Sequence, residues 1–314
     1  MAEPISRDQA ASVAARLRNA GRELGLSAEQ LQVMPVQMAY AQQGFLGRLD
    51  ASVHAERFVI KGGASLFTRF RQLGRPTRDL DLAALGPPPP LDEVLAWIHE
   101  ICAAPFGDSL VFAPEDIRAR SSAPESAAHP VVQVSLVAVL GRARQPLDLD
   151  VSFGNVIYPG LVQAHFPRLV IPEPVLVRIY PLEQVVTEKF AVMLELTVAN
   201  SRMKDLHDLW QIARAPGTQG AAGMRAADLA QAMRASFAVR RTPTANLALV
   251  LDPAFAQELG LLQAWAAYRR RNTWARLPEL ADILSVIRAF PGAVAQRLPW
   301  ESSGVWDPVK LSWQ

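Results

Sequence analysis

The segment from Lys61 to Asp81 constrains the fold more than any other part of the chain. It opens with a Lys-Gly-Gly turn, continues into a helix predicted over 64–73, and ends in a strand predicted over 77–83. Because side chains alternate along a strand, Asp79 and Asp81 are expected to project from the same face. Two neighbouring carboxylates repel each other unless a cation lies between them, so this pattern indicates a site for a cation such as Mg²⁺.

A second acidic strand, predicted over 146–153, offers a third carboxylate. Its alternation places apolar side chains on one face and Asp148, Asp150 and Ser152 on the other. If this strand neighbours the first acidic strand, Asp150 joins the earlier pair and completes the ligands for two metal ions about 4 Å apart. Asp148 is the rival candidate. Solvated carboxylates on an edge strand are the structural alternative.

The glycine turn and the residues after the short helix are predicted to contact phosphate. Backbone N–H groups of Gly62 and Gly63, at the start of a helix, suit a phosphate group. Thr77 is expected on the face of the acidic pair, where it could bond a phosphate oxygen or a metal-bound water. Arg75 could reach an incoming triphosphate. A metal pair beside a phosphate cradle is the arrangement used in nucleotidyl transfer.

Two predicted helices carry the second set of charged residues. Lys189 lies in the helix predicted over 182–198, and Lys204 and Asp205 begin the helix predicted over 203–214. These charges lie beside the apolar stripe of each helix. A lysine near the metals is expected to neutralise charge on a leaving pyrophosphate, with Asp205 orienting Lys189 or holding a base or ribose. Ordinary ion pairing on helix surfaces is the alternative.

Several aromatic and basic residues allow more than one interpretation. His207 is interpreted as a helix-surface residue. The arginine run 269–271, beside Tyr268 and Trp274, suits either an RNA backbone with stacked bases or a solvated helix end. The same two interpretations apply to the pair at 240–241. The tail tryptophans are expected to pin the end of the chain to the body: Trp300, Trp306 and Trp313.

The composition is that of a globular protein with a sizeable core, because half of the 314 residues are hydrophobic and a fifth are charged. The net charge of +2 neither requires nor opposes a nucleic-acid partner. The single cysteine, Cys102, permits no intrachain disulfide, which fits a reducing cytoplasm, and it is expected to be a buried thiol. We expect no signal peptide and no membrane span.

The character of the chain changes at Pro181, where mixed α/β patterns give way to helical ones. We therefore predict an α+β protein, with a mixed-sheet core over 1–180, a helical domain over 181–314, and the active site in the groove between them. Further predicted helices cover 6–23, 91–103, 224–238, 254–271 and 278–290, with a capping-box pair at Ser27 and Gln30. Further predicted strands cover 57–60, 131–140, 168–171 and 175–180, with a hairpin turn at 141–145.

Five pieces of the sequence resemble, in order, the nucleotidyl transferase AbiEii/AbiGii toxin family of the polymerase-β-like nucleotidyltransferase superfamily. They are Lys-Gly-Gly at 61–63, Arg-Pro-Thr-Arg-Asp-Leu-Asp at 75–81, Leu-Asp-Val-Ser-Phe-Gly at 149–154, Glu-Lys-Phe-Ala at 188–191 and Arg-Met-Lys-Asp-Leu-His-Asp-Leu at 202–209. Members act as toxins of type IV toxin–antitoxin or abortive-infection systems, and some transfer nucleotides to the tRNA 3′ end. Ala64 departs from the family pattern, which has Thr or Ser after the double glycine; Ser65 follows it.

The resemblance implies two Mg²⁺ ions, a nucleoside triphosphate substrate, tRNA as the acceptor, and an antitoxin encoded nearby. We expect a monomer. The metal ligands are expected to be Asp79, Asp81 and Asp150, and the catalytic set adds Lys189 and Asp205. The nucleotide-binding set comprises Lys61, Gly62, Gly63, Ser65, Arg75, Thr77 and Lys204. Two alternatives stay open: an acceptor that is a protein or small molecule, as for antibiotic nucleotidyltransferases, or a catalytically inert RNA- or partner-binding relative.

Overall fold

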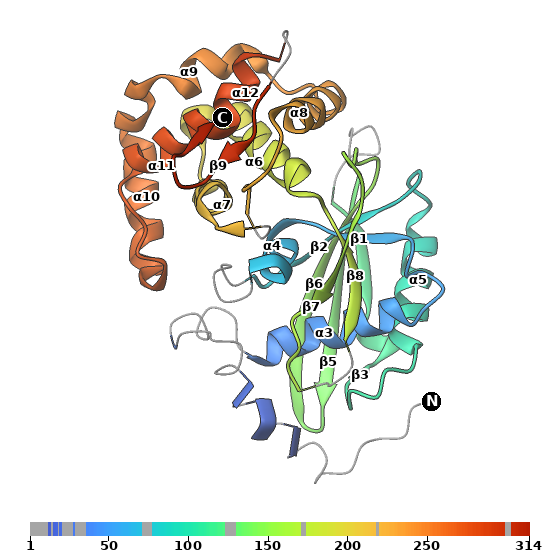
Figure 1. Ribbon diagram of the computed structural model, residues 1–314. Coiled ribbons are helices and arrows are strands. Elements are labelled where there is room, and N and C mark those ends of the chain that lie inside the picture. The colour runs from blue at the N-terminus through green and yellow to red at the C-terminus, as the bar shows by residue number, and fades with distance from the viewer. Residues whose placement is uncertain are drawn as a thin grey trace. The chain divides into compact units, whose positions relative to one another are not determined.

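The computed structural model describes residues 12–13, 15–17, 19–20, 28, 36–70, 77–122, 130–170, 174–217, 220–298 and 303–314. The chain divides into two compact units, which can be followed by colour in Figure 1. The first unit comprises Met1–Asn155 and Val162–Ile179, and the second comprises Val156–Leu161 and Tyr180–Gln314.

The first unit is built on a mixed sheet. Its strands are β1 (Phe58–Ile60), β2 (Leu80–Ala84), β3 (Val111–Phe112), β4 (Arg118–Ser121), β5 (Val131–Leu140), β6 (Ala143–Ser152), β7 (Val162–Phe166) and β8 (Val175–Ile179). They lie in the order β3-β5-β6-β2-β1-β8-β7, with β4 also paired to β5. The pairs β2–β6 and β1–β8 are parallel, and the other pairs are antiparallel.

Helices α3 (Val36–Asp50), α4 (Gly62–Phe70) and α5 (Leu91–Ala103) accompany this sheet. Helix α3 contacts β6, β8 and α5, and α4 contacts β2 and β7. The apolar residues that alternate along β2 and β6, such as Leu82 and Leu149, are buried in the core that α3 and α5 cover. Burial of that face leaves the acidic residues of both strands on the opposite one.

The second unit is mainly helical. It contains α6 (Leu182–Leu196), α7 (Met203–Arg214), α8 (Ala226–Arg240), α9 (Leu247–Leu251), α10 (Leu259–Arg271), α11 (Leu280–Ile287) and α12 (Ala293–Gln296), with π-helical residues Arg288–Gly292 before α12. Helix α6 packs against α7 and α8, and α11 packs against α7. Within the described ranges, no helix has both the length and the apolar character needed to cross a membrane.

The C-terminal tail forms a small hairpin, β9 (Trp306–Asp307) with β10 (Ser312–Trp313). The indole of Trp306 donates to the Ala213 carbonyl at 2.7 Å, and that of Trp313 donates to the Phe290 carbonyl at 3.0 Å. The ring centroids of Phe290 and Trp306 are 4.7 Å apart. These contacts confirm that two of the tail tryptophans pin the tail; Trp300 lies outside the described residues.

Several predicted elements are confirmed to the residue: α5, β5 and α7. The two acidic strands are also neighbours in the sheet, as the convergence of their aspartates requires, because β2 pairs with β6. The hairpin turn is tighter than predicted, since the β5–β6 ladder continues to Leu140 and Ala143 and leaves only residues 141–142 in the turn. The buried thiol of Cys102 is confirmed, and its burial raises the pKa to about 12.

Other predicted boundaries are wrong. No strand covers 168–170; the strand of that region is β7, whose outward residues are partly exposed, as an edge strand allows. Strand β2 begins at Leu80 rather than at Thr77, and α4 begins at Gly62 rather than at 64. The short strands β3, β4, β9 and β10 and helix α9 were not predicted. Most of the helix predicted over 6–23, the pair Ser27 and Gln30, and the end of the helix predicted over 64–73 lie outside the described residues.

Candidate active site

Two carboxylates from separate strands are direct neighbours on the sheet of the first unit. In the parallel pairing of β2 with β6, Asp81 stands opposite Asp150, and the flanking residues Leu80 and Leu149 stand opposite each other. Both aspartates are half-buried, whereas the two leucines are fully buried in the core. Neighbouring strands lie about 4.8 Å apart, so the backbone delivers both carboxylates to one place on the same face.

The glycine turn lies against one of these carboxylates. Gly62 is the first residue of α4 and has φ +59°, a conformation that residues with a side chain rarely adopt. A Cβ atom added to Gly62 would lie 2.0 Å from Oδ2 of Asp81. The backbone N–H of Lys61 donates to the carbonyl of Asp81 at 2.9 Å, which ties the turn to β2. The start of α4 and the Asp81 carboxylate therefore share one site.

The residues just before β2 are held by a buried glutamine. Gln42 of α3 donates from Nε2 to the carbonyls of Thr77, at 3.3 Å, and Arg78, at 3.2 Å. The Thr77 hydroxyl donates to the carbonyl of Asp79 at 3.3 Å, and Asp79 itself is exposed. Because the regular strand starts after this bend, the strict alternation expected from Thr77 to Asp81 does not extend through it.

The remaining predicted phosphate contacts have different surroundings. Ser65 is fully buried, and its hydroxyl donates to the Gly62 carbonyl of its own helix at 2.9 Å. Gly63 is buried and Lys61 is half-buried at the start of α4. Arg75 lies outside the described residues.

A three-carboxylate metal site is not formed by the part of the chain that the structure describes: no group of three or more His, Cys, Asp or Glu side chains is arranged to hold an ion. The sheet brings Asp81 and Asp150 together, while Asp79 lies exposed in the bend before β2. Two carboxylates are nevertheless a donor set that suits Mg²⁺, which usually takes one or two and completes its shell with water and substrate phosphates.

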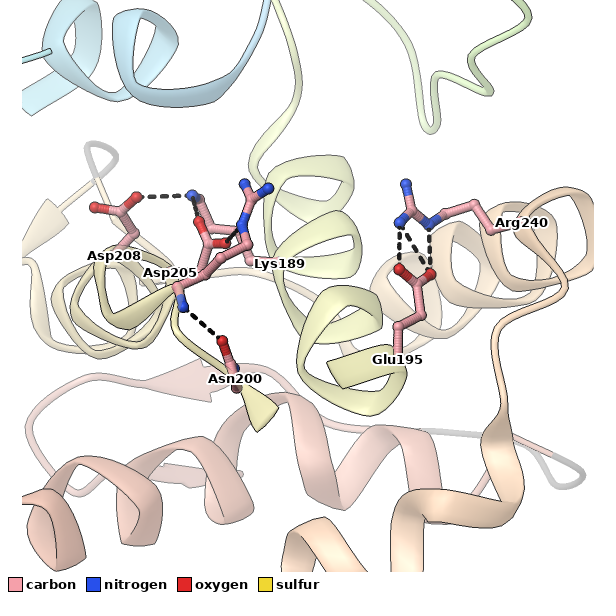
Figure 2. A network of polar contacts seen from close by, with 7 residues as sticks. Lys189, Glu195, Asn200, Asp205, Asp208 and Arg240 are labelled. Carbon is pink, nitrogen blue, oxygen red and sulfur yellow. Dashed lines mark hydrogen bonds and ion pairs between the residues drawn. The ribbon is translucent and has the colours of Figure 1, made fainter. Parts of the chain in front are cut away.

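Two members of the second predicted cluster, Lys189 and Asp205, belong to a buried ionic network within the second unit (Figure 2). The Lys189 ammonium, on α6, lies 2.7 Å from Oδ1 of Asp205 and 2.7 Å from Oδ2 of Asp208, both on α7. The other oxygen of Asp205 accepts from Nε of Arg202 at 2.7 Å. The side chains of Asp205 and Asp208 are 4% and 0% exposed. Asp205 and Lys189 are therefore paired in the structure, and the role of Asp205 in orienting an active-site lysine stays a prediction.

The charge state of Asp205 follows from its partners. Burial acts to raise the pKa of this carboxyl, but the positive charges of Lys189 and Arg202 outweigh burial and the repulsion from Asp208. The pKa of Asp205 is therefore lowered, and the carboxylate stays ionised. Lys204 is half-buried, and no ion pair between it and Asp205 occurs within the described residues.

Asp208 and Gln42 were not among the predicted site residues. Asp208 follows Asp205 by one helical turn, so both face the same way along α7, and this spacing was a usable signal. Gln42 sits in a run of α3 residues that are almost all buried, and only the fold shows which carbonyls it holds.

Figure 2 also shows Arg240 in a fork with Glu195, at 2.8 and 2.9 Å, so this arginine is engaged within the unit.

The interpretation of His207 as a surface residue is wrong. Its residue surface is 2% exposed, and Nδ1 lies 2.9 Å from the hydroxyl of Tyr268. Three rings surround the imidazole, those of Trp210, Tyr268 and Trp274. Two of these come from segments more than sixty residues away, so no local pattern around His207 could indicate its burial.

The mixed sheet with its helices confirms the predicted α+β fold class. Residues 44–285 match the family described as nucleotidyl transferase AbiEii toxin, type IV TA system. The chain belongs to this family, and it is therefore a nucleotidyltransferase of a toxin–antitoxin system, whose family implies an antitoxin partner.

Two solved structures from Helicobacter pylori are similar to this chain. The first is JHP933, with 14% sequence identity, a TM-score of 0.44, and coverage of 87% of this chain and 93% of that chain. The second, provisionally described as a nucleotidyltransferase, has 14% identity, a TM-score of 0.43, and coverage of 87% and 96%. A search of curated proteins found no match.

Proposed function

We propose that this protein is a Mg²⁺-dependent toxin that transfers nucleotides from a nucleoside triphosphate to the 3′ end of tRNA. The observation that carries the proposal is the register pairing of Asp81 with Asp150 beside Gly62. It joins a carboxylate pair to the start of a helix, where backbone N–H groups attract phosphate. Bound Mg²⁺ would supply Lewis-acid activation of the phosphate and of the attacking hydroxyl.

In the proposed reaction, the 3′ hydroxyl oxygen of the RNA attacks the α-phosphorus of the triphosphate. A new P–O bond forms in line with the P–O bond that breaks, and pyrophosphate leaves. Asp150 accepts the hydroxyl proton, and Asp81 and Asp150 hold the cation. Gly62 and Gly63 bind phosphate through their N–H groups. Asp79, Arg75 and Thr77 stay predicted contacts of the metal and triphosphate.

The ionic network on α6 and α7 is proposed to support the same reaction. Two carboxylates hold the Lys189 ammonium in place. A fixed cation can offset the charge that develops on a leaving pyrophosphate at little reorganisation cost. Lys204 and Asp205 stay predicted nucleotide contacts of this network.

The test is incubation of the purified protein with each of the four α-labelled triphosphates in turn, Mg²⁺ and total tRNA. Label is expected in RNA, in a form that removal of the 3′-terminal nucleotides releases. Chelation of Mg²⁺ with EDTA and the Asp81→Asn change should each abolish it. Label in protein or in a small molecule would instead identify a different acceptor, and no transfer with any base would contradict the proposal.

The cellular counterpart is growth arrest. Expression without the cognate antitoxin, which we propose is encoded in an adjacent reading frame, should arrest growth, and Asp81→Ala should relieve the arrest. Arrest that persists in the Asp81→Ala variant would separate toxicity from nucleotidyl transfer.

A further inference from the structure

Polar side chains form a row across four neighbouring strands of the first unit, and the carboxylate pair lies at one end of it. Asp81 of β2 stands opposite Asp150 of β6. On its other side, Asp150 stands opposite Gln133 of β5, which stands opposite Arg120 of β4. Residues directly opposite one another on paired strands point to the same face of a sheet. The face that carries the two carboxylates therefore also carries a cation two strands away from Asp150.

A second row lies beside the first, two residues away along each strand. Arg118 of β4 stands opposite Ser135 of β5, and Ser135 stands opposite Asp148 of β6, to which its hydroxyl donates at 2.8 Å. Arg118, Arg120 and Ser135 are exposed. Val134 of β5 points the other way and is 1% exposed, within the core. Both rows therefore lie on the face of the sheet opposite the core that α3 and α5 cover, and the two arginines are called the β4 arginines.

Neither β4 arginine is in an ion pair among the residues that the structure describes. Arg120 donates from Nε to the side-chain oxygen of Gln133, a neutral group, at 3.1 Å, and Arg118 donates to the preceding backbone carbonyl at 2.9 Å. Arg144 differs, because it lies farther along the same face on β6 and is paired with the carboxylate of Asp116 at 2.7 Å. A guanidinium has five N–H groups, so each β4 arginine keeps donors for an anion such as a phosphate.

The two sides of β2 suit the two substrates of nucleotidyl transfer. In-line displacement places the attacking hydroxyl and the leaving pyrophosphate on opposite sides of the α-phosphorus. On one side of β2 lies β1, which leads into the glycine turn at Gly62, proposed to bind the phosphates. On the other side lie β6, β5 and β4, with Asp150, Gln133 and Arg120 in register. A triphosphate over the glycine turn therefore leaves the β6 side for the acceptor.

We propose that the β4 arginines bind the phosphates that precede the 3′ end of the RNA acceptor. Neighbouring strands lie about 4.8 Å apart, so the Cα atoms of Arg120 and Asp150, two strands apart, are separated by roughly 10 Å. A stacked nucleic-acid strand covers that distance in about three nucleotides, at about 3.4 Å for each phosphate along the axis. The terminal hydroxyl therefore reaches Asp150 while phosphates upstream contact the β4 arginines. This inference rests on the proposed function, because it names where the acceptor of that reaction is held.

The test compares two double variants that lose the same charge. The β4 double combines Arg118→Gln and Arg120→Gln. The control double combines Arg142→Gln and Arg144→Gln, exposed residues at the turn of the β5–β6 hairpin. Arg144 lies six residues before Asp150 on β6, about 20 Å along the strand. The probe is labelled deacylated tRNA, in filter binding at several salt concentrations without triphosphate, so that the RNA stays unmodified. Circular dichroism confirms that both doubles are folded.

The β4 double should bind tRNA about tenfold more weakly than the wild type. The magnitude of its slope of log K against log salt should fall by about 0.7 for each phosphate contact that is lost. The control double should keep the wild-type affinity and slope. Equal losses of tRNA affinity in the two doubles, or no loss in the β4 double, would overturn the proposal.

Transfer kinetics test the proposed function separately. If the wild type transfers label to tRNA, the β4 double should have a raised KM for tRNA and an unchanged KM for the triphosphate, because its arginines lie on the acceptor side of the carboxylate pair. A raised triphosphate KM or an unchanged tRNA KM would refute this inference alone. No transfer by the wild type, with tRNA affinity still lost only in the β4 double, would refute the proposed function alone. Absence of both tRNA binding and transfer in the wild type would refute both.

Discussion

Asp81 and Asp150 face each other across the parallel pair β2–β6, and the carboxylate of Asp81 lies against the Cα of Gly62. Two backbone constraints therefore set the position of one side chain. The register fixes which residue of β6 it meets, and the absence of a side chain at Gly62 makes room for it. The site depends on strand pairing and on a single glycine more than on side-chain rotamers.

Loss of either paired carboxylate should abolish nucleotidyl transfer. Asp81→Asn and Asp150→Asn each remove a charge proposed to hold Mg²⁺, and a direct ligand should cost more than the roughly 10–100-fold typical of residues around a ligand. Asp148→Asn is the matched control, because Asp148 lies on the same strand and face but is exposed and bonded to Ser135 at 2.8 Å. Transfer rates, with circular dichroism to confirm folding, check this. A larger loss in Asp148→Asn would give Asp148 the role assigned to Asp150.

Gly62→Ala should impair the site more than its backbone strain predicts. The added Cβ would meet Asp81, and the positive φ costs about 1–2 kcal/mol for a residue with a side chain. Gly107→Ala is the control, because Gly107 has φ +58° and nothing within 4 Å of an added Cβ. Both variants should lose similar stability from strain, but only Gly62→Ala should also lose activity. Equal transfer rates would show that Asp81 adjusts freely.

Lys189→Met should destabilise the second unit by about 3–5 kcal/mol, because it removes the ammonium from two buried carboxylates. Lys204→Met, a change of the same kind at a half-buried lysine of the next helix, should stay within about 0.5 kcal/mol. Urea unfolding curves measure both. If Lys189→Met retains the wild-type midpoint but loses transfer activity, the ammonium acts on substrate alone and contributes little to the packing of α6 on α7.

The lowered pKa of Asp205 predicts a pH dependence of stability. A carboxyl with a lowered pKa in the fold stabilises it above its unfolded value of about 3.9, and this contribution disappears as the pH falls through the folded value. The gap in unfolding free energy between the wild type and Asp205→Asn should therefore be full near neutral pH and shrink below about pH 4. Urea midpoints for both proteins along this pH series test it. If the difference in unfolding free energy between the two proteins stays constant or grows as the pH falls, the result contradicts a lowered pKa of Asp205.

Trp306→Ala should destabilise the protein by about 3–5 kcal/mol, since it empties a site where the side chain is almost fully buried and bonded to Ala213. Val309→Ala, in the same tail and 90% exposed, should change the stability by less than about 0.5 kcal/mol. Thermal unfolding compares them. Similar melting temperatures for the two variants would mean that the hairpin does not hold the tail.

The elements that were predictable have strong local signals. Helix α5 follows four prolines, and the alternation along β5 ends at Gly141, so both boundaries coincide with the structure. By contrast, β4 reads Arg-Ala-Arg-Ser and is a strand only because β5 pairs with it. The run predicted as a strand at 168–171 has no such partner over its described residues, 168–170, and periodicity alone does not supply one.

The candidate site shows the same contrast between features that have a local sequence signal and features that depend on distant segments. Alternation along two acidic strands predicted which face of its own strand each aspartate occupies, and the pairing of β2 with β6 decides that Asp81 meets Asp150 rather than Asp148. The contact of Asp81 with Gly62 depends on a positive φ, and the burial of His207 depends on rings from distant segments, so neither is readable from local sequence. The bend at Asp79 arises from the hold of Gln42 on the backbone at Thr77 and Arg78, another long-range effect.

The division into units has a consequence for biosynthesis. Residues 156–161 belong to the second unit, yet β7 and β8 of the first unit follow them, so the chain crosses between the units after residues 155, 161 and 179. The first unit cannot close its sheet on the ribosome until β8 has emerged, by which time a stretch of its partner unit has already been made. A first-unit fragment that ends at residue 155 would lack β7 and β8, and one that ends at residue 179 would include residues 156–161 of the second unit. We therefore expect the two units to be expressed only as one chain.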